Sequence, residues 1–593
     1  MISNDCADLK FGPGSSAGFS AAGIAAFDDL RPAAVVRELV QNSLDAARSA
    51  GVPKAIVRFR LASVARDEIP GILAYEAAFR NALDRQRDPK TGVLPGQAKL
   101  IADRIEAALA EPHLEVLSVV DNGVGLDERR MNALLSDGVS AKEDRATGTY
   151  GNGHFTAVPA SDLRYVLYGG VTAGGRRIAS GHAILASHYV SGEDHLRGAD
   201  GFFIRRFNAG ESTLYDYATG QEVPDLIHRD LNHIQSTHSH GTSVIITAFN
   251  HFLEDDRSLW SMVAQAASAN FFVAIEDGTL EITVDDRRFG RDTQARTLNS
   301  STLREVLAEH QDQKRSGAFL SGHRAFHAHR AFRNGRRNAI ETEAGTITIH
   351  LREDTEATTR IDLCRNGMWI TDDRSSAGIP GFYYKFADRA PFQAVLSLNA
   401  DDGRDLHELI RIAEGPLHDS IRVKRLPRAD QARCRKALGE IRAWILDHTR
   451  AIQSDSYTPD DFLTLDFGDE AGAGVGKSVK GYWGTPVPVD RRPARQLLLF
   501  PDDDTQETEP GKPDPRNPGQ RRSPNADRSR QRPSLPSLFQ AASRPIGKHR
   551  RRIVIDCFRD YPDAELRLIA DEAIDATCDR PNQDPYMPAT LAN

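Results

Sequence analysis

Three polar side chains recur at helical spacing in the segment RPAAVVRELVQNSLDAARSAG, residues 31–51. A proline near its first turn and a glycine just past its end frame a helix. Glu38, Asn42 and Asp45 are spaced i, i+4, i+7, so they share one face of that helix. A carboxylate, an amide and a second carboxylate on one face could act as general base, metal ligand and support for a site. The same pattern also fits the solvated face of an amphipathic helix.

A second candidate site lies in EVLSVVDNGVGL, residues 115–126. The apolar run 116–120 is typical of a buried strand, and it ends directly at Asp121. An aspartate held at a strand end can accept a hydrogen bond from an exocyclic amine such as that of adenine. Gly123 and Gly125 would let the backbone approach a ligand closely. A tight turn produces the same DxGxG pattern.

The third segment, GTYGNGHFTA, is rich in glycine. Gly148, Gly151 and Gly153 precede an expected helix, so several backbone N–H groups could converge on an anion at its N-terminus. The polar stretch 134–145, which includes Lys142, could close over phosphates as a lid. The spacing excludes the Walker pattern, and no strand leads straight into the glycines as a Rossmann turn requires.

The order of these segments is more informative than any one of them. ExxxNxxDA comes first, then a strand with DxGxG, then a lid with GxxGxG, and then Gly241-Thr242 opening a strand over 243–247. This series resembles the GHKL ATPase superfamily, which includes gyrase B subunits, MutL mismatch-repair proteins, ninety-kilodalton heat-shock chaperones, MORC proteins and sensor histidine kinases. The resemblance covers about residues 15–285, nearly half of the chain. Four motifs in the right order make coincidence a poor explanation.

The resemblance implies a role for each matching residue of the first segment. Glu38 would be the general base that polarises the attacking water. Asn42 would coordinate a Mg²⁺ ion that bridges the phosphates of ATP. Asp45 would belong to the same helical face, near the nucleotide.

The resemblance also implies a base pocket and a phosphate cradle. Asp121 would bind the adenine amine, with Gly123 and Gly125 shaping the pocket, and Thr242 would help to fix the adenine through water. The residues expected at the phosphates are Lys142 of the lid and the glycines Gly148, Gly151 and Gly153.

Glu38 separates the branches of the superfamily. Sensor histidine kinases usually lack an acid four residues before the asparagine, whereas the hydrolytic branches carry one. The expected activity is therefore hydrolysis of ATP to ADP and phosphate by in-line attack of water. The resemblance further implies that ATP binding closes a homodimer, which hydrolysis reopens.

The fold expected from these patterns is α+β. We expect a Bergerat-type α/β sandwich ATPase domain with its lid over 1–295 and a transducer-like α/β domain over 296–470. A disordered linker rich in proline and arginine follows over 471–552, and a small αβ segment over 553–593. The linker prediction rests on low apolar content and on nine prolines from Pro501 to Pro545.

Local patterns place individual elements in the two larger parts. Apolar runs predict strands over 271–275 and 280–284 at the end of the first part. In the second part we expect strands over 346–351 and 361–364, and a long helix over 428–452.

The C-terminal segment carries a pattern of its own. Residues 553–557 have the composition of a strand and residues 564–573 that of a helix. Some 40 residues are few for an independent domain, so we expect this tail to need a partner protein.

The composition bounds the class of protein. Of 593 residues, 40% are hydrophobic and 27% charged, which excludes a fibrous, collagen-like or wholly disordered chain. We find no apolar run of about 18 residues and no secretory signal at the N-terminus, so no membrane contact is expected. Five scattered cysteines without a CxxC pair argue against a disulfide framework or a structural zinc site. They fit a reducing, cytoplasmic environment.

The second part offers candidates for coupling and for partner binding. Transducer domains of the hydrolytic branches send a lysine to the γ-phosphate, and Lys385 and Lys424 are the candidates here. The segment HRAFHAHRAFRNGRR, residues 323–337, combines basic groups with aromatics, which suits phosphate contact and base stacking. A solvated basic helix is the alternative interpretation.

Four histidines cluster before the Gly241-Thr242 strand, at positions 228, 233, 238 and 240. Histidines can bind a transition metal, but this spacing fits no standard site.

We expect the ATP switch to serve a nucleic-acid transaction on DNA or RNA, such as bacterial defence or DNA repair, by resemblance to MORC and MutL proteins. The net charge of −8 argues against wholesale coating of nucleic acid, although it leaves room for a local basic groove. The alternative function is a molecular chaperone of the heat-shock type that acts on protein clients. A further alternative is a domain that binds ATP as a structural clamp without turnover.

Overall fold

The structure is a computed structural model, and it describes residues 6–19, 32–88, 90–136, 157–208, 214–249, 258–288, 294–311, 322–354, 358–374, 378–383, 385–415, 420–451, 539–547 and 550–557. These residues fall into two compact units, Met1–Ile452 and Gln453–Asn593. The candidate site lies entirely in the first unit.

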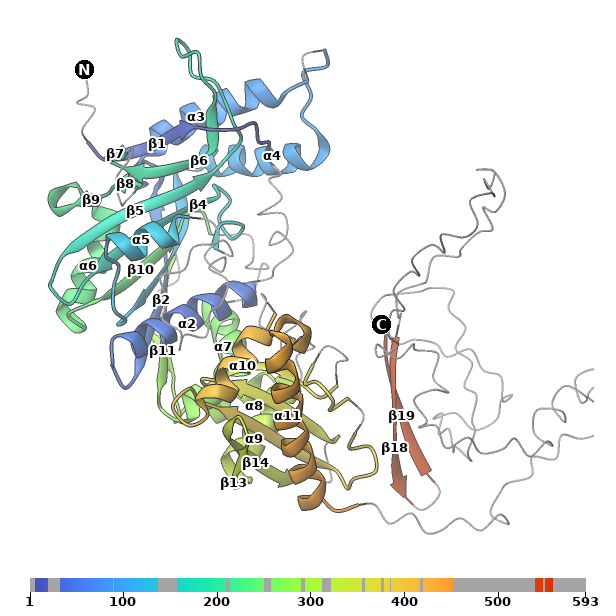
Figure 1. The fold of residues 1–593 in the computed structure, drawn as a ribbon. Helices are drawn as coiled ribbons and strands as arrows, with labels where there is room; N and C mark the ends of the chain where they lie inside the picture. Colours follow the sequence, from blue (N-terminus) through green and yellow to red (C-terminus); the bar gives the residue numbers. More distant parts are fainter. Residues whose placement is uncertain are drawn as a thin grey trace, which may run out of the picture. The chain divides into compact units, whose positions relative to one another are not determined.

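The strands of the first unit's large sheet are β1 (Asp8–Pro13), β2 (Ala55–Ala65), β3 (His113–Asp121), β4 (Tyr165–Val171), β5 (Arg177–Ile184), β6 (Arg197–Ile204), β9 (Ala218–Thr219), β10 (Gly241–Ile246), β11 (Leu280–Arg287) and β12 (Arg296–Leu298). Their order is β1-β6-β5-β4-β10-β3-β2-β11-β12, and β9 pairs with β5 (Figure 1). Neighbouring strands are antiparallel except β2 and β11, which run parallel. This order makes β3 and β10 neighbours although they are far apart in the chain.

A second, smaller sheet belongs to the same unit. Its strands are β13 (Arg336–Thr342), β14 (Gly345–Glu353), β15 (Arg360–Arg365), β16 (Met368–Asp372) and β17 (Phe392–Leu398). They follow the order β13-β14-β17-β15-β16, with β15 and β17 parallel and the other pairs antiparallel. A separate short ladder joins β7 (Arg206–Phe207) to β8 (Tyr215–Asp216).

The α-helices of the described residues are α2 (Pro32–Ser49), α3 (Ile72–Gln86), α4 (Gly96–Ala110), α5 (Glu128–Leu134), α6 (Asp225–Thr237), α7 (Leu259–Glu276), α8 (Leu303–Glu309), α9 (Gly322–Asn334), α10 (Arg404–Ala413) and α11 (Arg428–His448). With two mixed sheets and these helices, the fold is mixed α/β. The coarse part of the predicted fold class is thereby confirmed.

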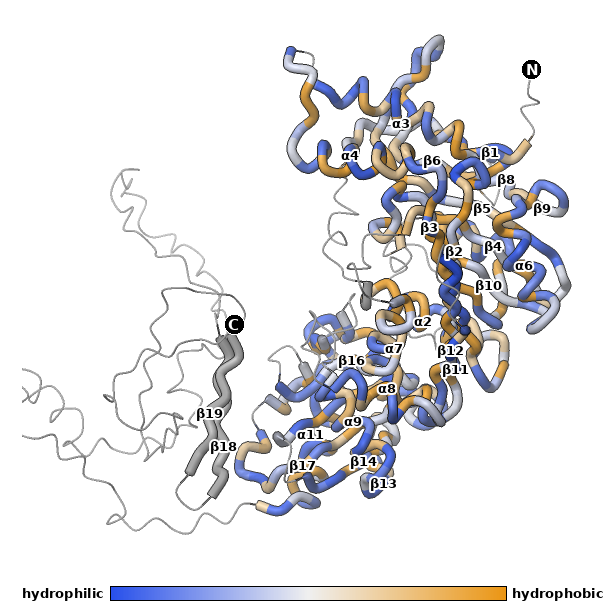
Figure 2. Tube along the Cα trace, turned by 180° about the vertical axis from the view of Figure 1, so that it is seen from behind, coloured by the Kyte–Doolittle hydropathy of each residue, from blue (hydrophilic) through white to orange (hydrophobic). Residues whose placement is uncertain are grey.

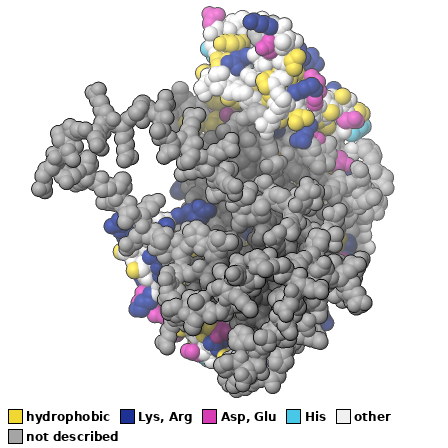
Figure 3. Space-filling view, turned by 90° about the vertical axis from the view of Figure 1, so that its right-hand side faces the viewer, with side chains coloured by type: hydrophobic (Ala, Val, Ile, Leu, Met, Phe, Trp, Pro, Cys, Tyr) yellow, Lys and Arg dark blue, Asp and Glu magenta, His cyan; other side chains and the backbone are white. Residues whose placement is uncertain are grey.

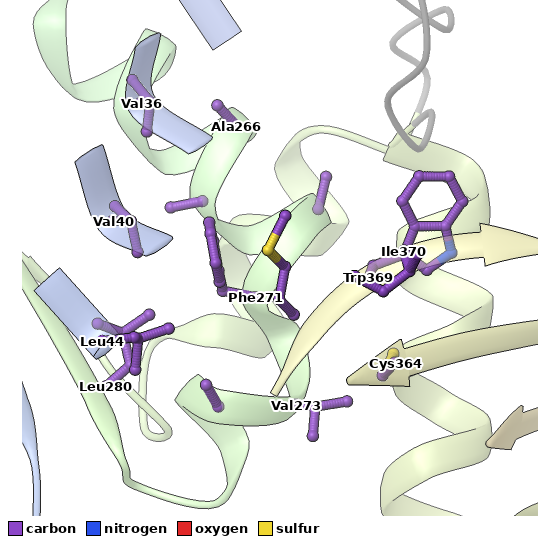
Figure 4. Packing of buried hydrophobic residues seen from close by; sticks show 14 of the residues in the cluster. Val36, Val40, Leu44, Ala266, Phe271, Val273, Leu280, Cys364, Trp369 and Ile370 are labelled. Atoms are coloured by element: carbon purple, nitrogen blue, oxygen red, sulfur yellow. The ribbon is translucent and has the colours of Figure 1, made fainter. Parts of the chain in front are cut away.

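One hydrophobic core joins the two sheets through α2 and α7. It contains buried residues of both helices together with residues of the large sheet and of the second sheet. Figure 4 shows Phe271 and Val273 of α7 between Val40 of α2 and Trp369 of β16. Hydrophobic residues, orange in Figure 2, gather in the strands and in α7, as expected for elements enclosed by others.

The predicted strand over 271–275 is wrong, because these residues belong to α7. The helix begins after Ser258, whose Oγ accepts a hydrogen bond from the backbone N of Ser261 at 3.1 Å. A short apolar run has the same appearance in a buried strand and in a helix that is enclosed on all sides. Phe271 itself has φ −125° and ψ 21°, which marks a kink in the helix.

The opposite face of the large sheet has its own core, built with α3, α4 and α6. On that face a buried carboxylate attaches α6 to the sheet. Asp230 accepts hydrogen bonds from Ser118 of β3 and, at 2.7 Å, from Ser243 of β10. Side chains alternate along a strand, so the neighbouring positions of β3 and β10 point to the α2 face.

Most predicted elements are confirmed. The helix framed by residues 31–51 is α2, the strand over 116–120 is β3, and the strand over 243–247 is β10 with slightly earlier bounds. The strands expected over 280–284, 346–351 and 361–364 are β11, β14 and β15, and the long helix over 428–452 is α11.

The second unit contains a two-stranded hairpin of β18 (Phe539–Gly547) and β19 (Arg550–Cys557). β19 includes the strand predicted over 553–557. The hairpin begins inside the range 471–552, whose expected disorder stays a prediction. The helix expected over 564–573 lies outside the described residues.

The boundary expected at residue 295 stays a prediction. β12 (Arg296–Leu298) still belongs to the large sheet, and both sheets lie within one compact unit. None of the described helices is both long and apolar enough to span a membrane.

A fully buried ion pair lies within the second sheet's part of the core. Arg365 of β15 donates from Nε and Nη2 to Oε2 of Glu414 at 2.8 and 2.5 Å. Both side chains are 0% exposed. Removing one member of such a pair leaves a buried charge without its counterion, which costs far more than losing an exposed pair.

We therefore predict that Glu414→Gln lowers the free energy of unfolding by roughly 3 kcal/mol. Lys436→Met removes one member of the exposed Lys436–Glu343 pair, with side chains 61% and 32% exposed, and should cost far less. Urea denaturation of both variants measures the difference. Equal costs for the two would contradict the structural role of the buried pair.

Candidate functional site

The helix α2, which carries the acid–amide motif, has one row of partly exposed side chains on an otherwise buried surface; we call this row the open line of α2. Between Ala34 and Ala47 of α2, every side chain is buried except Glu38, Asn42 and Ala46. These three are half-buried and spaced four residues apart, so they form a single line along the helix. A helix enclosed by two sheets exposes such a line only where its neighbours leave space beside it.

The two polar residues of this line contact each other. Asn42 donates from Nδ2 to Oε1 of Glu38 at 3.3 Å. This contact turns the amide so that its carbonyl oxygen is the atom able to ligate a hard cation. It also holds the Glu38 carboxylate on the open line of α2, where a substrate could reach it.

Asp121 ends β3 on the face that α2 covers. Its side chain is 8% exposed. Oδ1 accepts hydrogen bonds from the backbone N of Gly123 at 2.8 Å and from the backbone N of Thr242 on β10 at 3.1 Å. The carboxylate thereby joins the DxGxG loop to the start of β10.

The second carboxylate oxygen of Asp121 has weaker support. Ser43 Oγ of α2 lies 3.3 Å from Oδ2, but the same hydroxyl lies 2.9 Å from the carbonyl oxygen of Leu39. One hydroxyl hydrogen serves one acceptor at a time, and the shorter contact favours Leu39. Oδ2 therefore keeps capacity to accept a hydrogen bond from a ligand.

The pKa of Asp121 agrees with this incomplete hydrogen bonding of its carboxylate. Burial raises the pKa of Asp121 to about 6, although the hydrogen bonds from Gly123, Thr242 and Ser43 and the nearby His240 lower it. Burial prevails because three donors, one of them shared, do not replace the lost water. A further N–H donor at Oδ2 would stabilise the charged form.

Glycines allow the DxGxG loop to lie flat across the ends of three strands. Gly125 has φ +74°, and a Cβ there would lie 2.0 Å from the carbonyl oxygen of Val171 on β4. A Cβ on Gly241 would lie 2.0 Å from the carbonyl oxygen of Asp121. Side chains at these positions would push the loop off the sheet, so both glycines are required by the backbone packing.

The loop also packs against the open line of α2. A Cβ on Gly123 would lie 2.4 Å from Cβ of Ala46, and the backbone N of Val124 donates to the carbonyl oxygen of Ala46 at 3.2 Å. The line of Glu38, Asn42 and Ala46 therefore ends against the loop that carries Asp121. The structure thus brings together three of the four sequence segments, namely α2, the DxGxG loop and the start of β10.

Asp45 differs from its two partners in the motif. Its side chain is 3% exposed, and Oδ1 lies 3.6 Å from Nη1 of Arg48. Arg48 in turn donates to the carbonyl oxygen of Asn366, in the turn between β15 and β16, at 2.5 Å. These contacts tie Asp45 to the second sheet, and its expected place beside a nucleotide stays a prediction.

The remaining predicted phosphate ligands lie outside the described residues. They are Lys142, Gly148, Gly151 and Gly153.

The lysines proposed for the second part are on exposed positions. Lys385 lies in the segment between β16 and β17, and Lys424 lies in a short 3-10 helix, Val423–Arg425. The hydrogen bonds that join α2 to the second sheet come instead from arginines of α2. Arg37 donates from Nη2 to the carbonyl oxygen of Trp369 at 3.2 Å, beside the contact of Arg48.

The basic segment 323–337 is divided between internal contacts and exposed side chains, the latter including Arg333, Arg336 and Arg337. On α9, Arg324 pairs with Asp372, and His329 lies 2.8 Å from Oε2 of Glu276. Phe332, one of its two phenylalanines, is 7% exposed and therefore cannot stack on a base without rearrangement. Residues 323–334 belong to the amphipathic helix α9, which favours a solvated basic helix over base stacking.

The four clustered histidines have separate partners. Arg177 contacts Nδ1 of His228 at 2.9 Å, Arg58 contacts Nε2 of His233 at 3.4 Å, and the ring of His238 packs edge-on against that of His233. Within the described ranges no group of three or more His, Cys, Asp or Glu side chains could hold a metal ion.

A scan of the chain against protein-family models finds no match, and a search of curated proteins finds none either.

Sequence reasoning missed two residues of the site, Ser43 and His240. Ser43 follows Asn42 directly, and its helical direction toward β3 is visible only once the sheet is placed. His240 contacts the DxGxG loop through its ring. The signal that could have found it is its position just before Gly241-Thr242, at the start of a strand next to β3.

The raised pKa of Asp121 predicts a specific pH dependence of stability. Above pH 6 the folded protein holds an ionised, under-compensated carboxylate that the unfolded chain exposes to water, so ionisation opposes folding. As the pH falls through 6 toward 3.8, the folded state binds a proton that the unfolded state does not, and stability rises.

Asp121→Asn keeps the Oδ1 acceptor, and its amide can donate to Ser43. We predict that it raises the free energy of unfolding at pH 7.5 by on the order of 1–3 kcal/mol, with the gain vanishing near pH 4. Urea denaturation across this pH range measures it, with Asp103→Asn on α4 as the exposed control. A loss of stability that is independent of pH would assign Asp121 a purely structural role.

Proposed function

We propose that the chain is a GHKL-type ATPase that binds ATP and Mg²⁺ and hydrolyses ATP, with a Bergerat-type ATP-binding fold. The observation that carries this proposal is the open line of α2, with Glu38 and Asn42, ending against a loop whose buried Asp121 can accept one more hydrogen bond. A tight turn alone would not need a carboxylate with spare acceptor capacity in a buried position.

Asp121 suits recognition of adenine in particular. The exocyclic amine of adenine donates hydrogen bonds, and Oδ2 of a buried carboxylate accepts one. A base with a carbonyl at that position, such as hypoxanthine, would place two acceptors against each other. Selection by a buried unpaired group of this kind is strong.

Glu38 and Asn42 suit the phosphate end of the nucleotide. The amide oxygen of Asn42 is a hard ligand of the type that Mg²⁺ takes, together with oxygens of the phosphates. Mg²⁺, when bound, neutralises charge on the phosphates. Glu38 would orient a water molecule and accept its proton, because its carboxylate lies on the open side of α2 four residues from Asn42.

The same helix would pass the state of the nucleotide onward. Arg37 and Arg48 bind carbonyl oxygens of Trp369 and Asn366 in the second sheet. A shift of α2 on ATP binding would therefore move the β15–β16 hairpin. We propose that this movement accompanies closure of an ATP-dependent homodimer.

For the biological output we propose a nucleic-acid transaction in the cytoplasm, in bacterial defence or in DNA repair and remodelling. The net charge of −8 and the mixture of basic and acidic side chains on the described part of the face drawn in Figure 3 limit the nucleic-acid contact to a local surface. Chaperone action on protein clients, with the tail binding a partner protein, is the competing output. The response of ATP hydrolysis to DNA distinguishes the two outputs.

We predict that Glu38→Gln lowers the turnover number for ATP by at least about 100-fold while ATP still binds, because proton acceptance is lost and the base pocket remains. Asp121→Asn should instead abolish ATP binding, since its amide presents a donor to the adenine amine. Phosphate release and equilibrium nucleotide binding measure the two effects. Glu106→Gln, an exposed position on α4, serves as the matched control. Turnover by Glu38→Gln equal to wild type would refute the catalytic assignment.

We further predict that double-stranded DNA stimulates ATP hydrolysis and that stimulation weakens as salt rises, because phosphate contacts release counterions. Steady-state assays with and without DNA at two salt concentrations measure this, with Glu38→Gln as the blank. Glu38-dependent turnover that responds to an unfolded protein and not to DNA would favour the chaperone function.

A further inference from the structure

His240 makes a short contact with the DxGxG loop. Its Nδ1 lies 2.6 Å from the carbonyl oxygen of Gly123. A carbonyl oxygen only accepts hydrogen bonds, so Nδ1 must carry a hydrogen in this geometry. The contact therefore selects the Nδ1–H tautomer or the doubly protonated imidazolium.

This contact is one of several attachments of the loop to its neighbours. Val124 donates to Ala46 of α2, and Thr242 of β10 donates to the carboxylate of Asp121. His240 directly precedes β10, and its ring contacts Gly123, which lies between Asp121 and Val124 in the chain. Asn122 of the loop also donates from Nδ2 to the carbonyl oxygen of Lys54 and accepts from the backbone N of Ile56, both at 2.9 Å. The ring of His240 is the side-chain attachment that comes from the start of β10, and a substitution can remove it without touching the backbone.

His240 also faces Asp121 electrostatically. Its charge, when present, favours the ionised carboxylate and lowers the pKa of Asp121. His238, which follows the end of α6, interacts electrostatically with both His240 and His233 of α6. Burial lowers the pKa of His233 and of His238.

We propose that His240 is a positioning residue for base recognition: it holds the Asp121 loop against β10 and so sets how strictly the site selects an amine over a carbonyl on the purine. This inference rests on the proposed function and assigns specificity within it. The physical reason is that Oδ2 of Asp121 discriminates only while it is held at a fixed place. A loop free to retreat from β10 could admit water between Asp121 and the carbonyl of a wrong base.

The test compares the affinities for ATP and inosine triphosphate, whose base carries a carbonyl in place of the amine. We expect wild type to prefer ATP strongly. In His240→Ala, the ratio of the affinity for ATP to that for inosine triphosphate should fall about tenfold. His240→Asn should restore most of it, because an amide N–H can donate to Gly123 from the same side. His228→Ala removes a half-buried histidine that contacts Arg177, away from the loop, and should keep the wild-type preference.

A pH profile separates this role from a general structural one. Without His240, ATP affinity should begin to fall at a higher pH than in wild type, because the charge that favours ionised Asp121 is gone. A merely loosened fold would lower the affinity for both nucleotides equally and leave the midpoint of the pH profile in place. Such a result would overturn the proposal.

The contact between His240 and Gly123 is also testable without nucleotide. Nitrogen-15 spectra of the histidine rings should show hydrogen on Nδ1 of His240, and hydrogen on Nε2 alone would overturn the proposal. If wild type binds neither nucleotide, the proposed function itself fails and the inference falls with it. If wild type binds and prefers ATP while His240→Ala keeps that preference, only the role of His240 is refuted.

Discussion

Burial of α2 between two sheets is the constraint on which the rest of the structure depends. Its apolar side chains share one core with α7 and with strands of both sheets. Arg37 and Arg48 attach it to carbonyl oxygens of the second sheet. With these contacts made, Glu38, Asn42 and Ala46 alone remain half-buried between Ala34 and Ala47. A helix fixed on so many sides holds its open line at a defined distance from the sheet, which is what a preorganised site requires.

Asp121 lowers the stability of the folded protein in the candidate site. A buried carboxylate with one well-supported and one weakly supported oxygen opposes folding above its pKa of about 6. The surrounding backbone makes this tolerable, because Gly125 and Gly241 let the loop lie against the strand ends with its hydrogen bonds made. Perturbed groups of this kind gather at functional sites, where the missing interaction is supplied by the ligand.

The second sheet supports the candidate site mainly through internal ion pairs and less through exposed side chains. Arg365 and Glu414 form an ion pair with both side chains fully buried, and Arg324 of α9 pairs with Asp372 of β16. Within segment 323–337, Arg324 is neutralised by Asp372, whereas Arg333, Arg336 and Arg337 are exposed. The surface that would receive a partner is therefore smaller than the composition of segment 323–337 indicates.

The sequence by itself determined the local elements of the site. Helical spacing placed Glu38 and Asn42 on one face, and an apolar run predicted the strand that ends at Asp121, because periodicity depends only on neighbours in the chain. It also predicted where Thr242 opens a strand. Only the tertiary structure decided that β10 lies beside β3, that Ser43 and His240 reach the same loop, and that residues 271–275 are helical. These facts depend on burial and on pairing between distant segments, which no local pattern contains.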